Sequence, residues 1–322
     1  MFENISDLRI STRQIEESLF FPGPRKVTEV AGLLEYCQVI LEQCQKIDDP
    51  DFGIQQSHNN ERLWWRGHWN YAVVDGKWLC LRKSDSEPPR LDSLRLDIPV
   101  NYREQLMSKD LAKGGLVLIT GGPGSGKTTT ASATVVSRLE AYGGVCFAVE
   151  DPPEKPLNGW HGESGYCTQS RVVNGTKNPN AWNEALSDAL RSQPTATSTM
   201  LFVGEIRDNA CAQMAMKAAN EGFLVITTSF ANDIQSGIQA FIDRLGNTPE
   251  ALASLAAQLR LVVYQKIVPE LDILQVKTLL IRDGLPAMIR RGQLHGIENE
   301  VNSQQHQLLN ASFSAARFQR AA

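Results

Sequence analysis

The stretch from Gly115 to Thr128 reads GLVLITGGPGSGKT, and it decides the fold of most of the chain. Its first six residues, Gly115–Thr120, form an apolar run typical of a strand buried on both faces. The next eight fit the pattern G-x-x-x-x-G-K-[ST] and precede a helical pattern that begins near Lys127. This order predicts a phosphate-binding loop, because glycine backbones turn successive N–H groups inward and the helix N-terminus adds a positive partial charge.

Two side chains of this loop have expected tasks. Lys127 should bridge the β- and γ-phosphates of ATP, and the Thr128 hydroxyl should ligate Mg²⁺. The residues predicted to bind the nucleotide are Gly121, Gly122, Pro123, Gly124, Ser125, Gly126, Lys127, Thr128 and Thr129. The loop alone does not distinguish an ATPase from a small-molecule kinase, since both must cradle phosphates.

Three more apolar runs, Val145–Val149, Met200–Val203 and Phe223–Thr227, alternate with helical patterns. Such alternation predicts a mostly parallel sheet in an α/β domain. Glu150 follows the first of these runs, and Glu205 follows the second through one glycine. Both acids should emerge at the carboxyl edge of the sheet, beside the phosphates. A carboxylate there can hold the Mg²⁺ shell or polarise an attacking water.

Length and composition exclude several other classes of protein. A chain of 322 residues favours two domains, and 42% hydrophobic with 21% charged residues is ordinary globular usage. The net charge of −4 gives no electrostatic reason for direct nucleic-acid binding. The six cysteines contain no C-x-x-C pair. We find neither a signal peptide nor a membrane-spanning apolar run, so a membrane role would act through partners.

The first hundred residues predict a small α+β domain. Ile5–Ser11 is expected to be a strand, Val27–Cys44 has helical spacing, and Leu63–Trp69 and Tyr71–Leu81 are predicted strands, with a turn at Asp75-Gly76 inside the second. Four tryptophans in this region favour core packing or a subunit contact over a base-stacking platform, because no basic stripe accompanies them. Residues 84–98 have the proline-rich, charged composition of an interdomain linker.

At this point the sequence resembles a known family, the hexameric secretion and pilus ATPases of the GspE/PilT type, which includes type IV secretion ATPases. Ile119–Thr130 (ITGGPGSGKTTT) resembles their Walker A motif, and Val149–Glu154 (VEDPPE) resembles their Asp box. Val203–Asp208 (VGEIRD) is similar to their Walker B motif. Weaker similarities include LCLRKS at Leu79–Ser84 and the Gln265-Lys266 pair, so the resemblance extends over nearly the whole chain.

The resemblance implies a domain plan and an assembly. It implies a PAS-like N-terminal domain over 1–98 with the linker at about 84–98, a RecA-like ATPase domain over 99–285 and a helical tail over 286–322. It further implies a cytoplasmic subunit at the inner-membrane face, assembled as a homo-oligomeric ring, expected to be a hexamer, with ATP between subunits. The partner would be the inner-membrane platform protein of a pilus or secretion system.

The resemblance also implies roles for individual residues. Glu150 matches the catalytic Asp-box glutamate, and Glu205 matches the Walker B glutamate, which binds Mg²⁺ directly or through water. Arg66 and Arg82 are candidates to act on a neighbouring subunit's nucleotide, with surface charges on a strand as the alternative. Arginine suits that role because its planar, permanent charge stabilises a transferring phosphoryl group.

Two departures from the family pattern stand out. The His box of the family has two histidines, and this chain has Phe223 and Phe230 in their places. Phenylalanine can neither donate a hydrogen bond nor carry charge, so we expect ATP binding with hydrolysis that is slow or depends on assembly. The second departure is Lys155–Lys177, rich in Gly and Asn, which we interpret as an inserted loop beside the Asp box.

The leading hypothesis is an ATPase motor subunit that powers a type IV pilus or a type IV secretion or conjugation machine. Two alternatives stay open. One is a P-loop phosphotransferase, which would need a basic lid that we do not find in the sequence. The other is a nucleotide-binding subunit that is non-catalytic or weakly catalytic and shapes a ring with an active relative.

Overall fold

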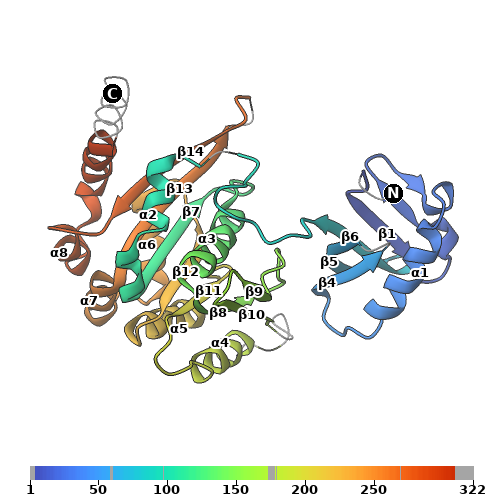
Figure 1. Ribbon diagram of the computed structural model, residues 1–322, viewed down its shortest axis with the longest axis horizontal. Coiled ribbons are helices and arrows are strands. Elements are labelled where there is room, and N and C mark those ends of the chain that lie inside the picture. The colour runs from blue at the N-terminus through green and yellow to red at the C-terminus, as the bar shows by residue number, and fades with distance from the viewer. Residues whose placement is uncertain are drawn as a thin grey trace. The chain divides into compact units, whose positions relative to one another are not determined.

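The computed structural model describes residues 4–58, 61–96, 98–172, 178, 180–268 and 270–308. Contacts divide the chain into two compact units (Figure 1). The first comprises Met1–Pro88, Glu150–Pro156 and Ser170–Ala181, and the second comprises Pro89–Val149, Leu157–Gln169 and Trp182–Ala322. The break between Pro88 and Pro89 falls inside the predicted linker of 84–98. The three-part division at 98 and 285 stays a prediction.

An antiparallel sheet forms the centre of the first unit, in the order β3-β2-β1-β6-β5-β4. Its strands are β1 (Asp7–Ser11), β2 (Leu19–Phe21), β3 (Arg25–Lys26), β4 (Asp51–His58), β5 (Glu61–Ala72) and β6 (Gly76–Ser84). Helix α1 (Leu33–Cys44) buries its apolar side chains in the same core as Trp65, whose indole N–H donates to the Tyr36 hydroxyl at 2.6 Å. This unit is the small α+β body that the sequence predicted.

The structure corrects two boundaries of this unit and adds a strand that was not predicted. The helix within Val27–Cys44 begins only at Leu33, because Gly32 has a left-handed φ of +77° and Val27–Glu29 forms a 3-10 turn. The predicted strand Tyr71–Leu81 is two pieces, with β5 ending at Ala72 and β6 beginning at Gly76 on the far side of the turn. Strand β4 was not predicted, because its polar sequence DFGIQQSH lacks an apolar run.

The second unit is built on a mixed sheet in the order β14-β13-β7-β12-β11-β8-β10-β9. The central strands β13, β7, β12, β11 and β8 run parallel. The strands are β7 (Gly115–Gly121), β8 (Gly144–Glu150), β9 (Gly159–His161), β10 (Gly165–Arg171), β11 (Thr199–Val203), β12 (Leu224–Phe230), β13 (Leu259–Val268) and β14 (Ile273–Leu280). All of β7 is buried, so side chains cover both faces of the sheet there. The predicted α/β fold with a mostly parallel sheet is confirmed.

Helices connect and cover these strands (Figure 1). They are α2 (Val100–Leu106), α3 (Lys127–Tyr142), α4 (Ala181–Arg191), α5 (Asn209–Asn220), α6 (Ile234–Arg244), α7 (Pro249–Gln258) and α8 (Leu285–Arg290). Residues 297–308 are also helical, and the remainder of the predicted tail, 309–322, lies outside the described residues. Across the described part of the chain, every helix is too short or too polar to cross a membrane.

The interpretation of Lys155–Lys177 as a loop is wrong over most of its length. Strands β9 and β10 form an antiparallel hairpin, and β10 adds it to the sheet next to β8. Its Trp160 and Tyr166 rings meet edge to face with centroids 5.1 Å apart. The segment looked like a loop because an edge hairpin leaves much of its surface in water and needs no apolar run. Residues 173–177 lie outside the described residues.

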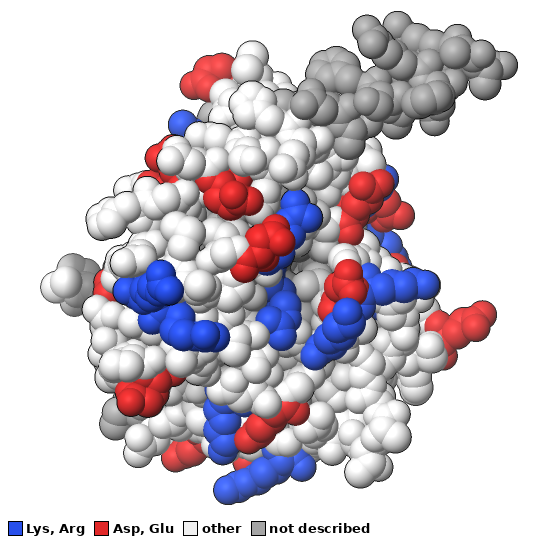
Figure 2. All heavy atoms as spheres, turned by 90° about the vertical axis from the view of Figure 1, so that its left-hand side faces the viewer, with Lys and Arg blue, Asp and Glu red and all other residues white. Residues whose placement is uncertain are grey.

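Figure 2 shows one face of the molecule, on which Lys and Arg side chains are interspersed with Asp and Glu. Opposite charges that lie so close together cancel at short range, so this face presents no extended field of one sign.

A buried arginine joins the phosphate-loop helix α3 to the preceding helix α2. Arg138 is 3% exposed, and its Nη1 donates to the carbonyl oxygens of Leu106 at 2.9 Å and Ser108 at 3.0 Å. Carbonyls at the end of a helix have no partner within the helix, so the guanidinium supplies the missing donors. Its guanidinium also lies 5.2 Å from the centre of the Tyr142 ring. Burial lowers the pKa of Arg138.

We predict that Arg138→Met lowers the free energy of unfolding by about 1–3 kcal/mol, because the Leu106 carbonyl loses its side-chain donor and the Ser108 carbonyl, which also accepts from the Leu111 N–H, loses one of its two donors. Urea unfolding measures the change. Arg95→Met is the matched control, since Arg95 is 79% exposed in its pair with Asp272, and this control should leave the unfolding free energy nearly unchanged. Equal losses in the two variants would contradict the structural role of Arg138.

Candidate functional site

The loop between β7 and α3 has the backbone of a phosphate cradle. Gly124 and Gly126 have left-handed φ values of +68° and +80°, which L side chains rarely adopt. Gly126 is the N-cap of α3 and supplies no side-chain cap, so the first-turn N–H groups of this helix are available to a ligand. A Cβ added at Gly122 or Gly124 would meet nothing within 4 Å, so the outer side of the loop is open. These features fit an anion bound by backbone N–H groups.

Lys127, the first residue of α3, is held at the mouth of this loop. Its side chain is nearly buried, with the residue 8% exposed. The ammonium Nζ donates to the Gly122 carbonyl at 2.8 Å and lies 4.3 Å from the centre of the Phe230 ring. Thr128 and Thr129 follow in the first turn of α3 and are partly exposed. The predicted loop residues therefore meet at one place, the carboxyl end of β7.

A buried glutamine on the neighbouring strand forms a hydrogen bond to the backbone of the phosphate loop. Gln265 of β13 is fully buried, and its Nε2 donates to the Ser125 carbonyl at 2.6 Å. Its Oε1 accepts from the Tyr102 hydroxyl of α2 at 3.2 Å. Burial raises the pKa of Tyr102, so this phenol stays protonated and can donate. The Ser125 hydroxyl is buried and, within the described residues, makes no hydrogen bond.

The loop that carries Glu205 is tied to the strands on both sides of β11. The Gly204 N–H donates to the Val149 carbonyl at 3.0 Å, and the Thr228 hydroxyl donates to the Gly204 carbonyl at 2.6 Å. The Ile206 N–H donates to the Thr228 carbonyl at 3.1 Å. Glu205 itself is partly exposed and forms an ion pair with Arg207 at 3.4 Å. These bonds fix the backbone on either side of the carboxylate.

Glu150 is the last residue of β8, and only 2% of its surface is exposed. Its Oε2 accepts from the Glu154 N–H at 3.4 Å. The residue before it, Val149, pairs directly with Val203 of β11. Glu150 and Glu205 therefore follow paired positions of adjacent parallel strands, at the carboxyl edge that the sequence predicted.

The predicted arginines lie together on the sheet of the first unit. Arg66 of β5 and Arg82 of β6 are cross-strand partners. Arg66 pairs with Glu154 at 3.1 Å and Arg82 with Asp7 at 3.1 Å, in contacts with much of the side-chain surface exposed. With Arg9, they line a cavity of ≈ 210 Å³. The structure therefore brings these arginines together within the first unit, and their action on a nucleotide stays a prediction.

The two phenylalanines at the positions of the family's histidines have different places. Phe223 is fully buried just before β12 begins, at the amino edge of the sheet. Phe230 ends β12, pairs with Gly121 and is 49% exposed beside Lys127. At about 3.3 Å per residue, seven residues of strand separate them by roughly 20 Å. Phe230 is thus part of the site, whereas Phe223 is a core residue.

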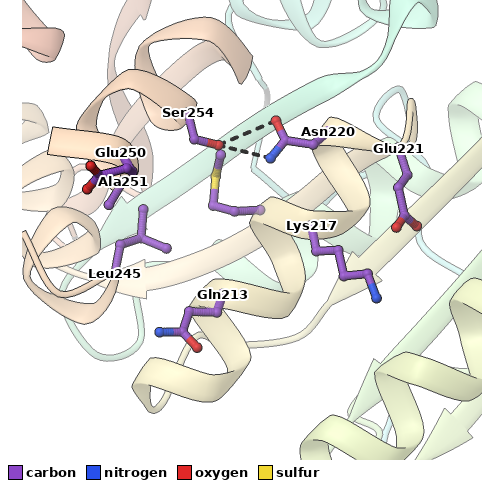
Figure 3. Close-up of a pocket in the computed structure, with 9 residues that line it drawn as sticks. Gln213, Lys217, Asn220, Glu221, Leu245, Glu250, Ala251 and Ser254 are labelled. Carbon is purple, nitrogen blue, oxygen red and sulfur yellow. Dashed lines mark hydrogen bonds between the residues drawn. The ribbon is translucent and has the colours of Figure 1, made fainter. Parts of the chain in front are cut away.

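A second hollow lies away from this loop, between α5 and α7 (Figure 3). Its volume is ≈ 370 Å³, and Asn220 and Ser254 form a hydrogen bond of 2.9 Å at its wall. Lys217 extends from the last turn of α5, and Glu221 is the residue that follows the helix. None of the residues that the sequence predicted for the nucleotide site lines this hollow.

Gln265, Tyr102 and the contact between Lys127 and Phe230 were not predicted as parts of the site. The sequence did hold an indication of the role of Gln265. A glutamine within the apolar strand LRLVVYQKIV is expected to be buried and to need a hydrogen-bond partner. Tyr102 gave no signal, because it lies in an ordinary helix well before the loop.

Comparison with known proteins gives a consistent result. The family described as "Type II/IV secretion system protein" matches residues 71–310. Type II secretion system protein HxcR of Pseudomonas aeruginosa is 36% identical over 179 residues, covering 56% of this chain and 35% of that protein. Type IV pilus ATPase PilU of the same organism is 27% identical over 232 residues, covering 68% and 55%. The aligned region thus spans between about a third and about half of these relatives.

Solved structures share the fold. The pilus retraction motor PilT with bound ADP has a TM-score of 0.69 at 21% identity, covering 92% of this chain and 84% of that one. The ATPase DotB of Legionella pneumophila has a TM-score of 0.62 at 23% identity, covering 95% and 84%.

We predict that Gln265→Met and Tyr102→Phe are coupled in their effects on stability. Gln265→Met leaves the Ser125 carbonyl buried without this donor and should lower the unfolding free energy by about 1–3 kcal/mol. Tyr102→Phe removes the hydrogen bond to Gln265 and should cost about 0.5–1.5 kcal/mol. The double variant should lose less than the sum of the two, as measured by urea unfolding. Strict additivity would show that the chain of bonds does not act as a unit.

Proposed function

Because this chain belongs to the type II/IV secretion system protein family, we propose that it is an ATPase motor subunit that powers a type IV pilus or a type IV secretion or conjugation machine. The observation that carries the proposal is the strand register at one sheet edge. Four adjacent parallel strands end at this edge. The phosphate loop follows β7, and Phe230 ends β12. Glu205 follows β11, and Glu150 ends β8. Phosphate-binding backbone and two acids at one edge suit transfer of a phosphoryl group to water.

In this proposal the residues divide the chemistry among them. The backbone N–H groups between Gly121 and Thr129, Pro123 excepted, and the Lys127 ammonium bind the phosphates of ATP. Thr128 and Glu205 offer the oxygen donors that Mg²⁺ prefers, and a bound Mg²⁺ would neutralise charge on the phosphates. The buried Glu150 carboxylate is placed to orient or deprotonate the attacking water. The bonds from Val149 and Thr228 to the Glu205 loop keep that carboxylate at the edge.

We further propose that the subunits form a ring, expected to be hexameric, in the cytoplasm at the inner-membrane face, with the machine's platform protein as partner. Arg66 and Arg82 would reach a neighbouring subunit's nucleotide. Support comes from the ion pairs that these arginines form here with Glu154 and Asp7. The Arg66 and Arg82 side chains are 42% and 77% exposed in these pairs. Exposed ion pairs are worth about 0–1 kcal/mol, so exchanging a carboxylate for a phosphate would cost little. The names of HxcR and PilU support the class of machine.

One observation favours a second candidate, a ring subunit that binds nucleotide but hydrolyses it slowly or not at all. The residue that contacts Lys127 from β12 is Phe230, which has no group to donate a hydrogen bond to a phosphate or relay a proton. This candidate shares the nucleotide site and differs only in turnover.

We predict that the specific ATPase activity rises with subunit concentration, because arginines of one subunit complete the site of the next. Steady-state phosphate release, measured without any acceptor substrate across a dilution series, gives the activity, and light scattering on the same samples gives the oligomeric state. Activity that is independent of oligomerisation would contradict a shared site. Turnover that appears only with an added acceptor would indicate a phosphotransferase.

We predict that Glu205→Gln lowers ATP turnover at least about a hundredfold while nucleotide binding persists, since the neutral amide is a weaker ligand for Mg²⁺ than the carboxylate. Phosphate release and ADP titration measure the two effects. Glu163→Gln, an exposed position in the β9–β10 turn, is the matched control and should retain wild-type turnover. If the wild type hydrolyses ATP no faster than Glu205→Gln, the non-catalytic candidate is correct.

A further inference from the structure

We propose that Phe230 is a positioning residue whose ring competes with bound phosphate for the ammonium of Lys127. The inference rests on the proposed function of the phosphate loop and goes beyond it, because it assigns a task to a residue outside that loop. Under this proposal Phe230 lowers the affinity for nucleotide and speeds its release.

The position of Phe230 follows from strand pairing. Phe230 is the last residue of β12, and its backbone pairs with Gly121, the last residue of β7 and the first of the loop. This register fixes the ring at the mouth of the loop. The ring is half exposed, with 49% of the residue's surface accessible, while Lys127 beneath it is 8% exposed. An exposed aromatic ring therefore covers a nearly buried ammonium.

The ammonium contacts both a carbonyl oxygen and an aromatic ring. The Lys127 Nζ donates to the Gly122 carbonyl at 2.8 Å and lies 4.3 Å from the centre of the Phe230 ring. A cation within about 6 Å of an aromatic face is attracted by the negative charge above the ring, and the attraction grows as water is excluded. The carbonyl and the ring therefore share one charge.

A phosphate in the loop needs that same charge. To bind it, the ammonium must turn from the Gly122 carbonyl toward phosphate oxygens, and its contact with the ring weakens. The face of the Phe230 ring carries negative partial charge and is unfavourable to an anion. Phe230 therefore stabilises the arrangement seen here over the phosphate-bound one. Phenylalanine does not titrate, so the ring itself contributes no pH dependence to this competition, unlike an imidazole at this position.

The size of the effect follows from the strength of such contacts. A cation–π contact of intermediate burial corresponds to a change of about threefold to tenfold in a dissociation constant. Affinity differences between related complexes lie mostly in the dissociation rate, so most of this factor should appear as faster release of nucleotide.

The first experiment examines the contact itself without any nucleotide. Full-length wild type, Phe230→Leu and Phe230→Tyr are treated briefly with acetic anhydride, and mass spectrometry gives the acetylation rate of each lysine. Leucine removes the ring and should raise the rate at Lys127, whereas tyrosine keeps the ring and should give the wild-type rate. Lys77, which lies 3.7 Å from the centre of the Trp69 ring, is the internal control and should not change. An unchanged rate at Lys127 in Phe230→Leu would overturn the inference.

The second experiment measures ADP binding and release in the same three proteins by titration and stopped flow. Phe230→Leu should bind ADP about threefold to tenfold more tightly and release it more slowly, and Phe230→Tyr should resemble the wild type. Equal or weaker binding by Phe230→Leu would overturn the inference even if acetylation had increased. A wild type that binds no ADP would instead refute the proposed function, and the acetylation rates distinguish that failure from failure of the contact.

Discussion

Parallel pairing of five adjacent strands is the constraint on which the rest of the second unit depends. In a parallel sheet every strand ends at the same edge, so residues far apart in the sequence meet there. Pairing of Gly121 with Phe230 and of Thr120 with Tyr264 brings the loop beside Phe230 and Gln265. Pairing of Val149 with Val203 brings the two acids to the same edge. A shift of one residue in any of these registers would turn the side chains to the other face.

Two buried hydrogen bonds support the backbone of the phosphate loop. The hydrogen bonds from Tyr102 to Gln265 and from Gln265 to Ser125 lie in the interior, where each bond is stronger than in water and each lost partner costs more. The arginines of the first unit differ, since Arg66 and Arg82 form pairs exposed to water and salt. This contrast suits the proposed roles, because the loop must keep its shape while the arginines must change partners.

The sequence predicted the structural elements that are encoded by consecutive residues. The strand GLVLIT, the glycine loop and the start of α3 at Lys127 are encoded in consecutive residues, and the structure confirms them. The position of the acids at the strand ends could be predicted equally well, because parallel strands end at the same edge of a sheet. Strands β4 and β9 at sheet edges, and β10 next to β9, were missed, since half-exposed strands need no apolar run. The contacts of Gln265 and Phe230 could not be predicted, because they depend on which strands are neighbours.

Comparison with the family's His box treats Phe223 and Phe230 alike, but the two residues lie at opposite edges of the sheet and have different effects. Phe223 is fully buried at the amino edge of the sheet, so the aromatic ring there serves the core and bears on stability. Phe230 stands at the carboxyl edge, where it removes a hydrogen-bond donor from the site but supplies a surface that attracts the ammonium of Lys127. Under the proposed function, loss of the donor bears on the chemical step, whereas the ring bears on binding and release. Under these proposals, nucleotide affinity and hydrolysis rate depend on different properties of the Phe230 side chain.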